Sequence, residues 1–301
     1  MGPCHISAII AEVALRAADP GPPMSLPRTT ILPGASLPLA APSDVSVTAL
    51  GRITQGDRWR TEAMRSYSCP VLIWVTRGQG RITMAGRRRG YTPNSLIFLP
   101  AGTMHGFDRM GAVSGSVVFL PRGGDTQWPD APLQINLSDS RRQMELTQQI
   151  DALDRETSDT SPSRDKALSC LTGLLSVWLE RLLTDRTPTT STKSEDLVAA
   201  YAALVERDFA SGGTVGDLAR GLGVTATHLT RVCRTANGTS AHDLLANRRH
   251  FEAKRLLVDT DLPVGDVARQ SGFSSLAYFS RTFRQNTGQS PSAFRSARQA
   301  H

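Results

Sequence analysis

The sequence predicts an α+β protein of two domains, in which a β domain with trailing helices precedes an all-helical domain. Three observations support this prediction. From about residue 45 to residue 120, short apolar runs alternate with Gly and Pro. Apolar residues then recur at helical spacing, and beyond a polar stretch near residue 190 the pattern is helical throughout. A chain of 301 residues is long enough for about two domains that each bury a core.

The composition and charge of the chain favour some classes of protein over others. The formal net charge of +7 and the pI of about 9.7 favour an anionic partner, although arginines that only solvate the surface would give the same values. No uninterrupted apolar run approaches the roughly 18 residues of a membrane span, so none is expected. The four cysteines include no C-x-x-C pair and are expected to be free thiols in a cytoplasmic protein.

Residues 1–40 are expected to form a disordered tail. Glu12 and Arg16 interrupt the apolar patch in this tail and no basic segment precedes it, so a secretory signal is not expected. Met24 follows a Pro/Gly cluster and is an alternative to Met1 as the start of the chain.

Residues 45–183 are expected to form the β domain and its helices. The runs VLIWVTRGQG, RITMAGRRRG, SLIFLPAG and SGSVVFLPRGG are rich in Val, Ile and Phe and bounded by Gly or Pro, which is typical of the strands of a sandwich or barrel. An exposed hairpin tip is expected at Arg87, Arg88 and Arg89. Two apolar stripes at helical spacing follow, which would pack on the barrel or on a second subunit. They are Leu146, Ile150 and Leu153, then Leu168, Leu171, Leu174, Leu175, Leu179 and Leu182.

The helical domain, residues 197–298, is expected after a linker at 184–196 that is dense in Thr, Ser and Pro. It contains an internal repeat: VGDLARGLGV returns as VGDVARQSGF, and LTRVCRTANGTS aligns with FSRTFRQNTGQS. Each copy reads as a helix, a glycine turn and a second helix, the helix-turn-helix layout. A single copy would equally suit an ordinary helical hairpin, whereas two copies in a basic protein favour DNA.

The helix predicted between the copies, from Ala241 to Val258, would span roughly 26 Å, not far short of one turn of B-DNA. A rigid spacer of this length could hold two recognition helices in successive major-groove segments on one face of the duplex. The spacing therefore gives a geometric reason for the duplication.

The segment VGDVARQSGFSSLAYFSRTFRQNTGQSPSAFR resembles the C-terminal signature of the AraC/XylS family of bacterial transcription regulators. Its Gly-Phe, Tyr-Phe-Ser-Arg-x-Phe and Gly-x-x-Pro elements occur in order, and the resemblance covers roughly Leu197 to Arg298. It implies two helix-turn-helix units joined by a long helix, which bind tandem major-groove segments of promoter DNA. It also implies RNA polymerase as a partner, a homodimer and no cofactor.

By this resemblance the recognition helices run from about Thr225 to Thr235 and from about Ser275 to Asn286. The expected DNA-binding residues are Thr227, Thr230, Arg231, Arg234, Leu276, Ala277, Ser280, Arg281 and Arg284. Arg231 and Arg281 are expected to dominate, because an arginine can bridge guanine O6 and N7, whereas the apolar pair can touch only thymine methyls or sugar. The remaining arginines are expected at phosphates or in inter-helix salt bridges, with a solvated helix face as the alternative. They are Arg234, Arg284, Arg248 and Arg249.

The aromatic residues of the second copy are expected in the core, because helical spacing places them off the arginine face. They are Phe273, Phe279, Phe283 and Phe294. Val224 and Cys233 replace two of these phenylalanines in the first copy, which implies a looser unit and a buried structural thiol rather than a redox sensor.

The segment LIWVTRGQGRITMAGRRRGYTPNSLIFLPAGTMHGF resembles the small cupin barrel often fused to such DNA-binding units, and PAGTMH matches the second cupin motif. A metal-dependent cupin enzyme needs several converging His and Glu ligands. Upstream of His105, the stretch WRTEAMRSYSCPVLIW has no histidine and only Glu62. Neither a metal site nor an enzyme is therefore expected.

His105 has two interpretations: a residue that completes a strand-end turn through a hydrogen bond, or a polar group of an effector pocket. In the second case its possible neighbours are Trp74, Arg77, Tyr67 and Arg65, whose arginines favour an anionic or polar small molecule. The predicted function is a sequence-specific DNA-binding transcription regulator controlled by such an effector. The alternatives are a ligand-independent regulator that uses the barrel for dimerisation or partner binding, and a cupin enzyme.

Overall fold

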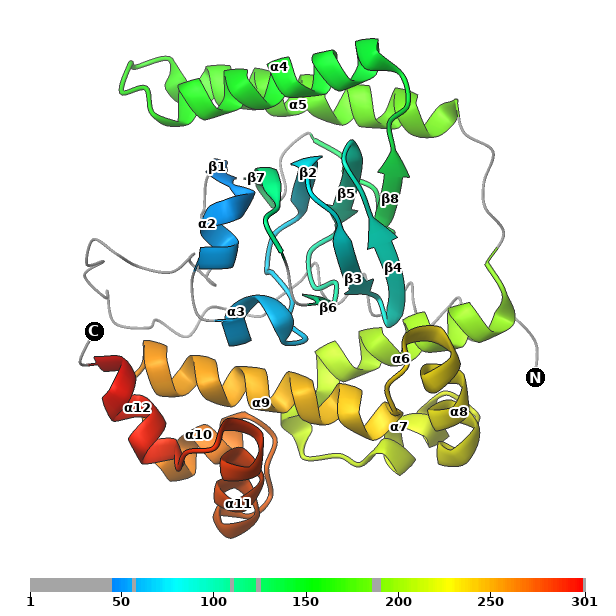
Figure 1. Ribbon diagram of the computed structural model, residues 1–301, viewed down its shortest axis with the longest axis vertical. Helices are drawn as coiled ribbons and strands as arrows, with labels where there is room; N and C mark the ends of the chain where they lie inside the picture. Colours follow the sequence, from blue (N-terminus) through cyan, green and yellow to red (C-terminus); the bar gives the residue numbers. More distant parts are fainter. Residues whose placement is uncertain (1–44, 56–57, 109–110, 123–125, 186–190, 300–301) are drawn as a thin grey trace.

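The computed structural model describes residues 45–299 except 56–57, 109–110, 123–125 and 186–190 (Figure 1). The tail predicted for residues 1–40 and both candidate starts lie outside the described residues. A pair of long helices covers one side of a β domain, and the C-terminal helices lie on the opposite side (Figure 1). The predicted α+β two-domain fold is confirmed.

The β domain contains two antiparallel sheets. The five-stranded sheet has the order β1-β7-β2-β5-β8, formed by Ser46–Ala49, Ser114–Phe119, Val71–Arg77, Ser95–Leu99 and Leu133–Asn136. The three-stranded sheet has the order β4-β3-β6, formed by Arg87–Tyr91, Gly80–Met84 and His105–Phe107. Two short helices, α2 (Leu50–Gln55) and α3 (Arg58–Glu62), follow β1.

Both faces of the larger sheet are buried, which explains why its strands read as continuous apolar runs. Along β2, Val71 and Ile73 face the core that the two sheets share. Leu72 and Trp74, which alternate with them, face the long helices α4 (Ser140–Thr157) and α5 (Arg164–Thr184). This alternation divides the domain into two apolar layers on either side of one sheet.

Helix α5 packs on its own β domain, which is one of the two arrangements that the sequence left open. Leu168, Leu175, Leu179 and Leu182 are buried there together with Leu146, Ile150 and Leu153 of α4. Leu174, expected on the same stripe, lies off that face and is 55% exposed. An 18-residue window of α5 has a mean hydropathy of 1.3, so by length and composition alone this helix could cross a membrane, a test that a helix packed in a protein core also passes.

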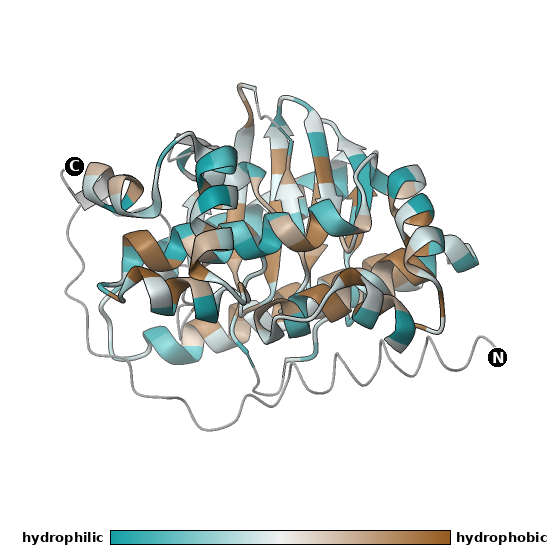
Figure 2. Ribbon diagram, turned by 90° about the horizontal axis from the view of Figure 1, so that it is seen from below, coloured by the Kyte–Doolittle hydropathy of each residue, from teal (hydrophilic) through white to brown (hydrophobic). Residues whose placement is uncertain are grey.

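The C-terminal domain consists of α6 and two helix-turn-helix units joined by α9. Its helices are α6 Lys193–Asp208, α7 Val215–Gly221, α8 Ala226–Asn237, α9 Ala241–Asp259, α10 Val264–Gln270, α11 Leu276–Thr287 and α12 Pro291–Gln299. Leu244 and Leu245 of α9 belong to the core of the first unit, whereas Leu256 and Leu257 belong to the core of the second. Figure 2 shows hydrophobic and hydrophilic residues on the same helices, as expected for elements with one buried face.

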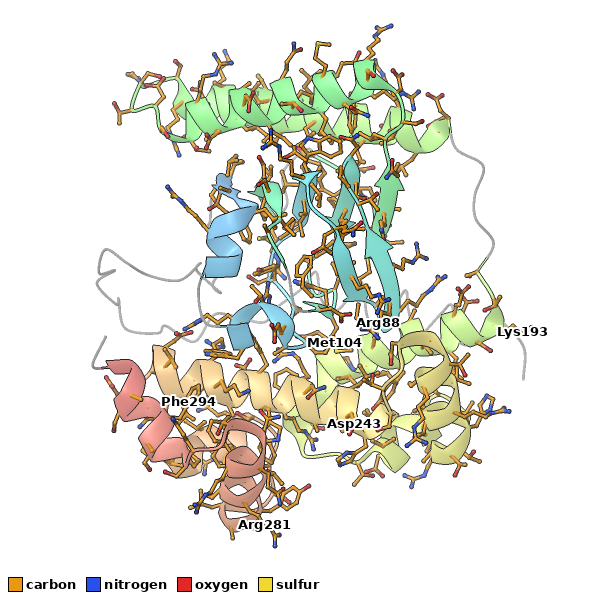
Figure 3. All side chains as sticks on the ribbon, viewed as in Figure 1. Arg88, Met104, Lys193, Asp243, Arg281 and Phe294 are labelled. Atoms are coloured by element: carbon orange, nitrogen blue, oxygen red, sulfur yellow. The ribbon has the colours of Figure 1, made fainter. Side chains whose placement is uncertain are left out.

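The turn between β3 and β4 is one of the places where the two domains are in contact. Met104 of the β domain is buried in the core of the first helical unit (Figure 3). At the turn, Gly86 has a φ of +72°, and a Cβ there would lie 2.5 Å from Val198 Cγ1 of α6. The Gly86 carbonyl accepts a 2.8 Å hydrogen bond from Asn237 Nδ2, at the last residue of α8.

The expectation of an exposed hairpin tip at the three consecutive arginines is wrong. The hairpin exists, but its turn is covered by α6 and α8, because apolar residues of α6 fill the space above it. Arg87 is ion-paired with Glu195 of α6, and Arg88 is ion-paired with Asp108. Burial lowers the pKa of half-buried Arg89, and the nearby charge of Arg87 lowers it further.

Candidate nucleic-acid interface

The repeat in the sequence folds into two helices of equal length and equal capping. Helix α8 follows the N-cap Thr225 and α11 follows the N-cap Ser275, and each hydroxyl accepts from the backbone N–H three residues on. Each helix has 12 residues and ends at a left-handed glycine, Gly238 at φ +81° and Gly288 at φ +77°. Positions counted from the two N-caps are therefore structurally equivalent.

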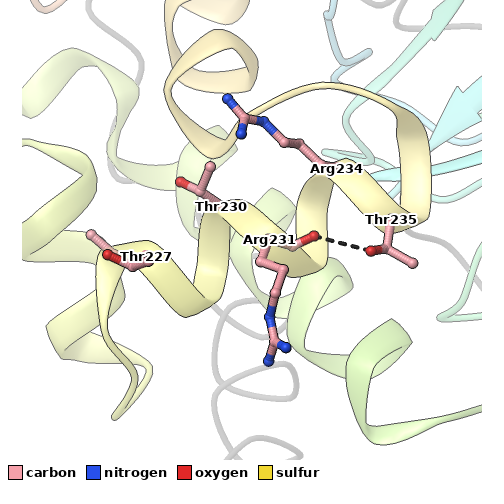
Figure 4. A pocket seen from close by; sticks show the side chains of 6 residues that line it. Thr227, Thr230, Arg231, Arg234 and Thr235 are labelled. Atoms are coloured by element: carbon pink, nitrogen blue, oxygen red, sulfur yellow. Dashed lines mark hydrogen bonds between the residues drawn. The ribbon is translucent and has the colours of Figure 1, made fainter.

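Helix α8 presents a polar, positively charged face. Thr227, Arg231 and Arg234 are exposed and Thr230 is half-buried. With Ala226 and Thr235 these residues line an open hollow of about 620 Å³ (Figure 4). The opposite face, with Leu229, Val232 and Cys233, is buried in the first unit.

Helix α11 presents the corresponding face of the second unit. Leu276 is 51% exposed, Ala277, Arg281 and Arg284 are also exposed, and Ser280 is half-buried. Arg281 lies on the side of the helical domain remote from the β domain (Figure 3). The predicted aromatic core is confirmed, since Phe279, Phe283 and Phe294 are buried and Phe273 packs against them.

Arg248 of α9 forms an inter-helix salt bridge, which is one of the roles expected for it, whereas Arg249 binds backbone carbonyls instead. Arg248 donates to both carboxylate oxygens of Glu206, at 2.7 and 3.0 Å, and to Glu252 at 3.1 Å. Burial acts to lower the pKa of Arg248, but the two carboxylates outweigh it, so the pKa is raised. Arg249 donates to the carbonyls of Phe209 and Gly213, both at 2.8 Å. Arg248 therefore fixes α9 to α6, and Arg249 fixes α9 to the segment that connects α6 with α7.

Three of the five candidate effector residues lie together, and the other two lie elsewhere in the β domain. Arg65, Tyr67 and His105 lie together at the end of the β domain that faces the helical domain: Arg65 donates to the Tyr67 hydroxyl at 2.9 Å, and the Tyr67 and His105 rings are 5.0 Å apart. Trp74 instead faces α4, where its Nε1 donates to Thr147 Oγ1 at 3.3 Å. Arg77 is exposed at the end of β2. The five residues therefore do not line one common pocket.

His105 is fully buried and both of its interpretations have support. Its Nδ1 lies 2.9 Å from the Thr103 carbonyl, which can only accept, so Nδ1 carries the proton. Burial, and then the charge of Arg65, lower the pKa of His105 to about 3, which keeps the ring neutral. Nε2 is then an acceptor; neither it nor Arg65 Nε has a hydrogen-bond partner among the described residues. The cluster thus holds one buried acceptor and one buried donor that are unsatisfied.

The described cysteines are free thiols, and two of them are buried. Cys233 is buried, and burial raises the pKa of its thiol to about 12, as expected of a structural cysteine. Cys69 is also buried, Cys170 is exposed, and all three are free. Within the described part of the chain, no three His, Cys, Asp or Glu side chains gather as metal ligands.

Sequence reasoning missed three residues of this region. Tyr278, which is 43% exposed, and His228 lie beside Arg281 of α11 and Arg231 of α8. Asn237 joins the first of these helices to the β domain. The aligned repeat contained a signal for two of them, because His228 and Tyr278 are both ring side chains at the same position.

The chain is similar to known regulators over its helix-turn-helix region. A model of a helix-turn-helix domain matches residues 218–297. An uncharacterized HTH-type transcriptional regulator of Staphylococcus aureus is 33% identical over 107 residues, which are 36% of this chain and 14% of that protein. This chain also spans 39% of an uncharacterized HTH-type regulator of Escherichia coli, at 32% identity. It therefore covers well under two thirds of either relative.

Two further similarities extend over both domains. The arabinose operon regulatory protein of Escherichia coli is 26% identical over 254 residues, which are 78% of this chain and 82% of that protein. Among solved structures, an apo ToxT variant from Vibrio cholerae matches at 16% identity and a TM-score of 0.39, over 83% of this chain and 96% of that one.

Proposed function

We propose that this chain belongs to the AraC/XylS family and that it is a sequence-specific transcription regulator that binds promoter DNA through α8 and α11. The observation that carries the proposal is the equivalence of these helices: Arg231 and Arg281 stand at the same position after the N-cap and are both exposed. An arginine at the major groove can read guanine by two hydrogen bonds. Thr227, Thr230, Ala277 and Ser280 would share the base contacts, and Arg234 and Arg284 would bind phosphates.

A footprint on the DNA beside the protein's own gene tests this function. Two protected major-groove segments about one helical turn apart are expected. Arg281→Ala should cost about 1–3 kcal/mol on that site and much less on random DNA. The matched control is Arg269→Ala, an exposed arginine of the same unit that pairs with Asp266 on α10 at 2.7 Å. Equal binding of the wild-type chain to all sequences would contradict the proposal.

We further propose that residues 45–183 form the sensor domain and that Arg65, Tyr67 and His105 contribute to its effector site. A hydroxyl group could satisfy both orphaned atoms, because it can accept from Arg65 Nε and donate to His105 Nε2. The cluster is close to the helical domain: Ser66 donates to Glu206 Oε1 of α6 at 2.7 Å, and Glu206 binds Arg248. A small hydroxyl-bearing ligand, such as a sugar or a hydroxy acid, would therefore act beside the interdomain contact.

Thermal unfolding with a panel of sugars and hydroxy acids tests the effector site, because a ligand of the folded state raises the midpoint. Loss of the shift in His105→Asn, which keeps a donor for the Thr103 carbonyl, would support the assignment. If no compound shifts the wild-type midpoint, the ligand-independent regulator is favoured.

We also propose that the protein is cytoplasmic, is not an enzyme and forms a homodimer. On promoter DNA it would recruit RNA polymerase. Leu174 and Val177 are exposed on α5, at 55% and 39%, and support dimerisation through its outer face. Sedimentation of Leu174→Asp tests this: a monomer is expected, whereas an unchanged dimer would exclude this face. Direct binding to RNA polymerase on the footprinted DNA tests the last partner.

A further inference from the structure

Each recognition helix carries a ring side chain that contacts its arginine. In α8, Arg231 Nη2 lies 3.1 Å from His228 Nδ1. In α11, Arg281 Cζ lies 5.9 Å from the centre of the Tyr278 ring. His228 and Tyr278 both stand three residues after the N-cap and three residues before the arginine, a spacing that places side chains side by side on a helix.

The direction of the hydrogen bond between Arg231 and His228 follows from the chemistry of arginine. An arginine can only donate, so His228 Nδ1 is the acceptor of this hydrogen bond. The second pair is different, because a guanidinium near an aromatic ring is attracted by the negative face of the ring. The two units therefore restrain equivalent arginines by different contacts.

The other arginine of each recognition helix lacks such a neighbour. Arg234 and Arg284 are exposed one turn further on, and no ring contacts either of them within the described residues. Ring contacts thus accompany the arginines at the base-reading positions and not those assigned to phosphates. This is expected if reading a base needs a defined guanidinium direction, whereas a phosphate can be met from many directions.

We propose that His228 and Tyr278 are positioning residues, which hold the guanidiniums of Arg231 and Arg281 ready for the major groove before DNA binds. The inference rests on the proposed DNA-binding function. A free arginine side chain loses much rotamer freedom when it is fixed at an interface, and a side chain that is already restrained loses less. Removing a ring should therefore weaken specific binding by about 3- to 10-fold.

Double-mutant cycles in the full-length chain test this inference. The probe is a duplex that the wild-type protein selects from a random pool, and a scrambled duplex is the control. His228→Ala should weaken binding to the selected duplex about 3- to 10-fold, but less than twofold when Arg231 is already Ala. His228→Asn, which keeps an acceptor near the Nδ1 position, should recover much of the loss. Tyr278→Phe should bind like the wild type, whereas Tyr278→Ala should not.

The outcomes separate the inference from the proposed function. An equal loss with and without the arginine would overturn the inference, because the ring would then contact DNA itself. No loss in either ring variant would also overturn it. If the wild-type chain selects no sequence at all, the proposed function fails instead. Unchanged unfolding midpoints of the variants, whose side chains lie on the surface, confirm that the fold is kept.

Discussion

Replacing Asn237 by Thr should loosen the contact between the β domain and the first helix-turn-helix unit. Thr287 occupies the equivalent position in the second unit, where its hydroxyl accepts from Gln289 N at 3.3 Å, within its own helix end. Asn237→Thr should keep the corresponding acceptor for Thr239 N, but a threonine cannot reach the Gly86 carbonyl. The substitution thus removes the interdomain hydrogen bond and spares the local cap.

The expected magnitude follows from the burial of that bond. An unsatisfied buried carbonyl costs about 1–3 kcal/mol, which makes opening of the turn about 5- to 150-fold more frequent. Hydrogen exchange of a peptide that covers residues 84–91 measures this opening. Thr287→Ala is the control and should leave the peptide unchanged. Unchanged exchange in Asn237→Thr would refute the view that this bond closes the domain junction.

Three further predictions follow from buried groups. The pKa of His105 is about 3 when folded against 6.5 as the reference, so the unfolded chain binds more protons between these values. Stability is therefore lost as the pH falls below 6.5, by about 2 kcal/mol at pH 5, and His105→Asn should flatten the denaturation profile there. Arg248→Ala should cost about 3–5 kcal/mol in chemical denaturation, because it leaves the half-buried Glu206 carboxylate without its charge partner. Leu175→Ala should lower stability by about 2–5 kcal/mol, whereas Leu174→Ala, on the outer face of α5, should change it little.

Local pattern was sufficient for the helical domain. The repeat and the aromatic core both depend on residues close in sequence, whose spacing determines which helix face they occupy. The buried stripe of α4 was predictable for the same reason. Leu174 was misplaced because a stripe of leucines shows an apolar helix, but not where its buried face ends.

Contacts between segments that are far apart in the chain could not be predicted from the sequence. The three arginines at 87–89 suggested a solvated tip, but the neighbour that covers the turn is Val198, more than 100 residues later. The separation of Trp74 and Arg77 from the other effector candidates could not be predicted for a similar reason: a one-residue change of strand register moves a side chain to the other face of a sheet. Trp74 therefore faces α4, while His105 lies against Tyr67.

The hydrogen bond at the Gly86 carbonyl also limits how the chain can be recombined. The acceptor in the β domain is the backbone carbonyl of Gly86, a left-handed glycine, so no side chain of that domain takes part. The donor is the side chain of one residue, Asn237, at the end of α8. A chimaera joined between α5 and α6 would separate these two partners, although the junction itself lies in neither helix. A transplanted helical domain would need an amide at the position of Asn237 and a short side chain above the turn to dock on this β domain.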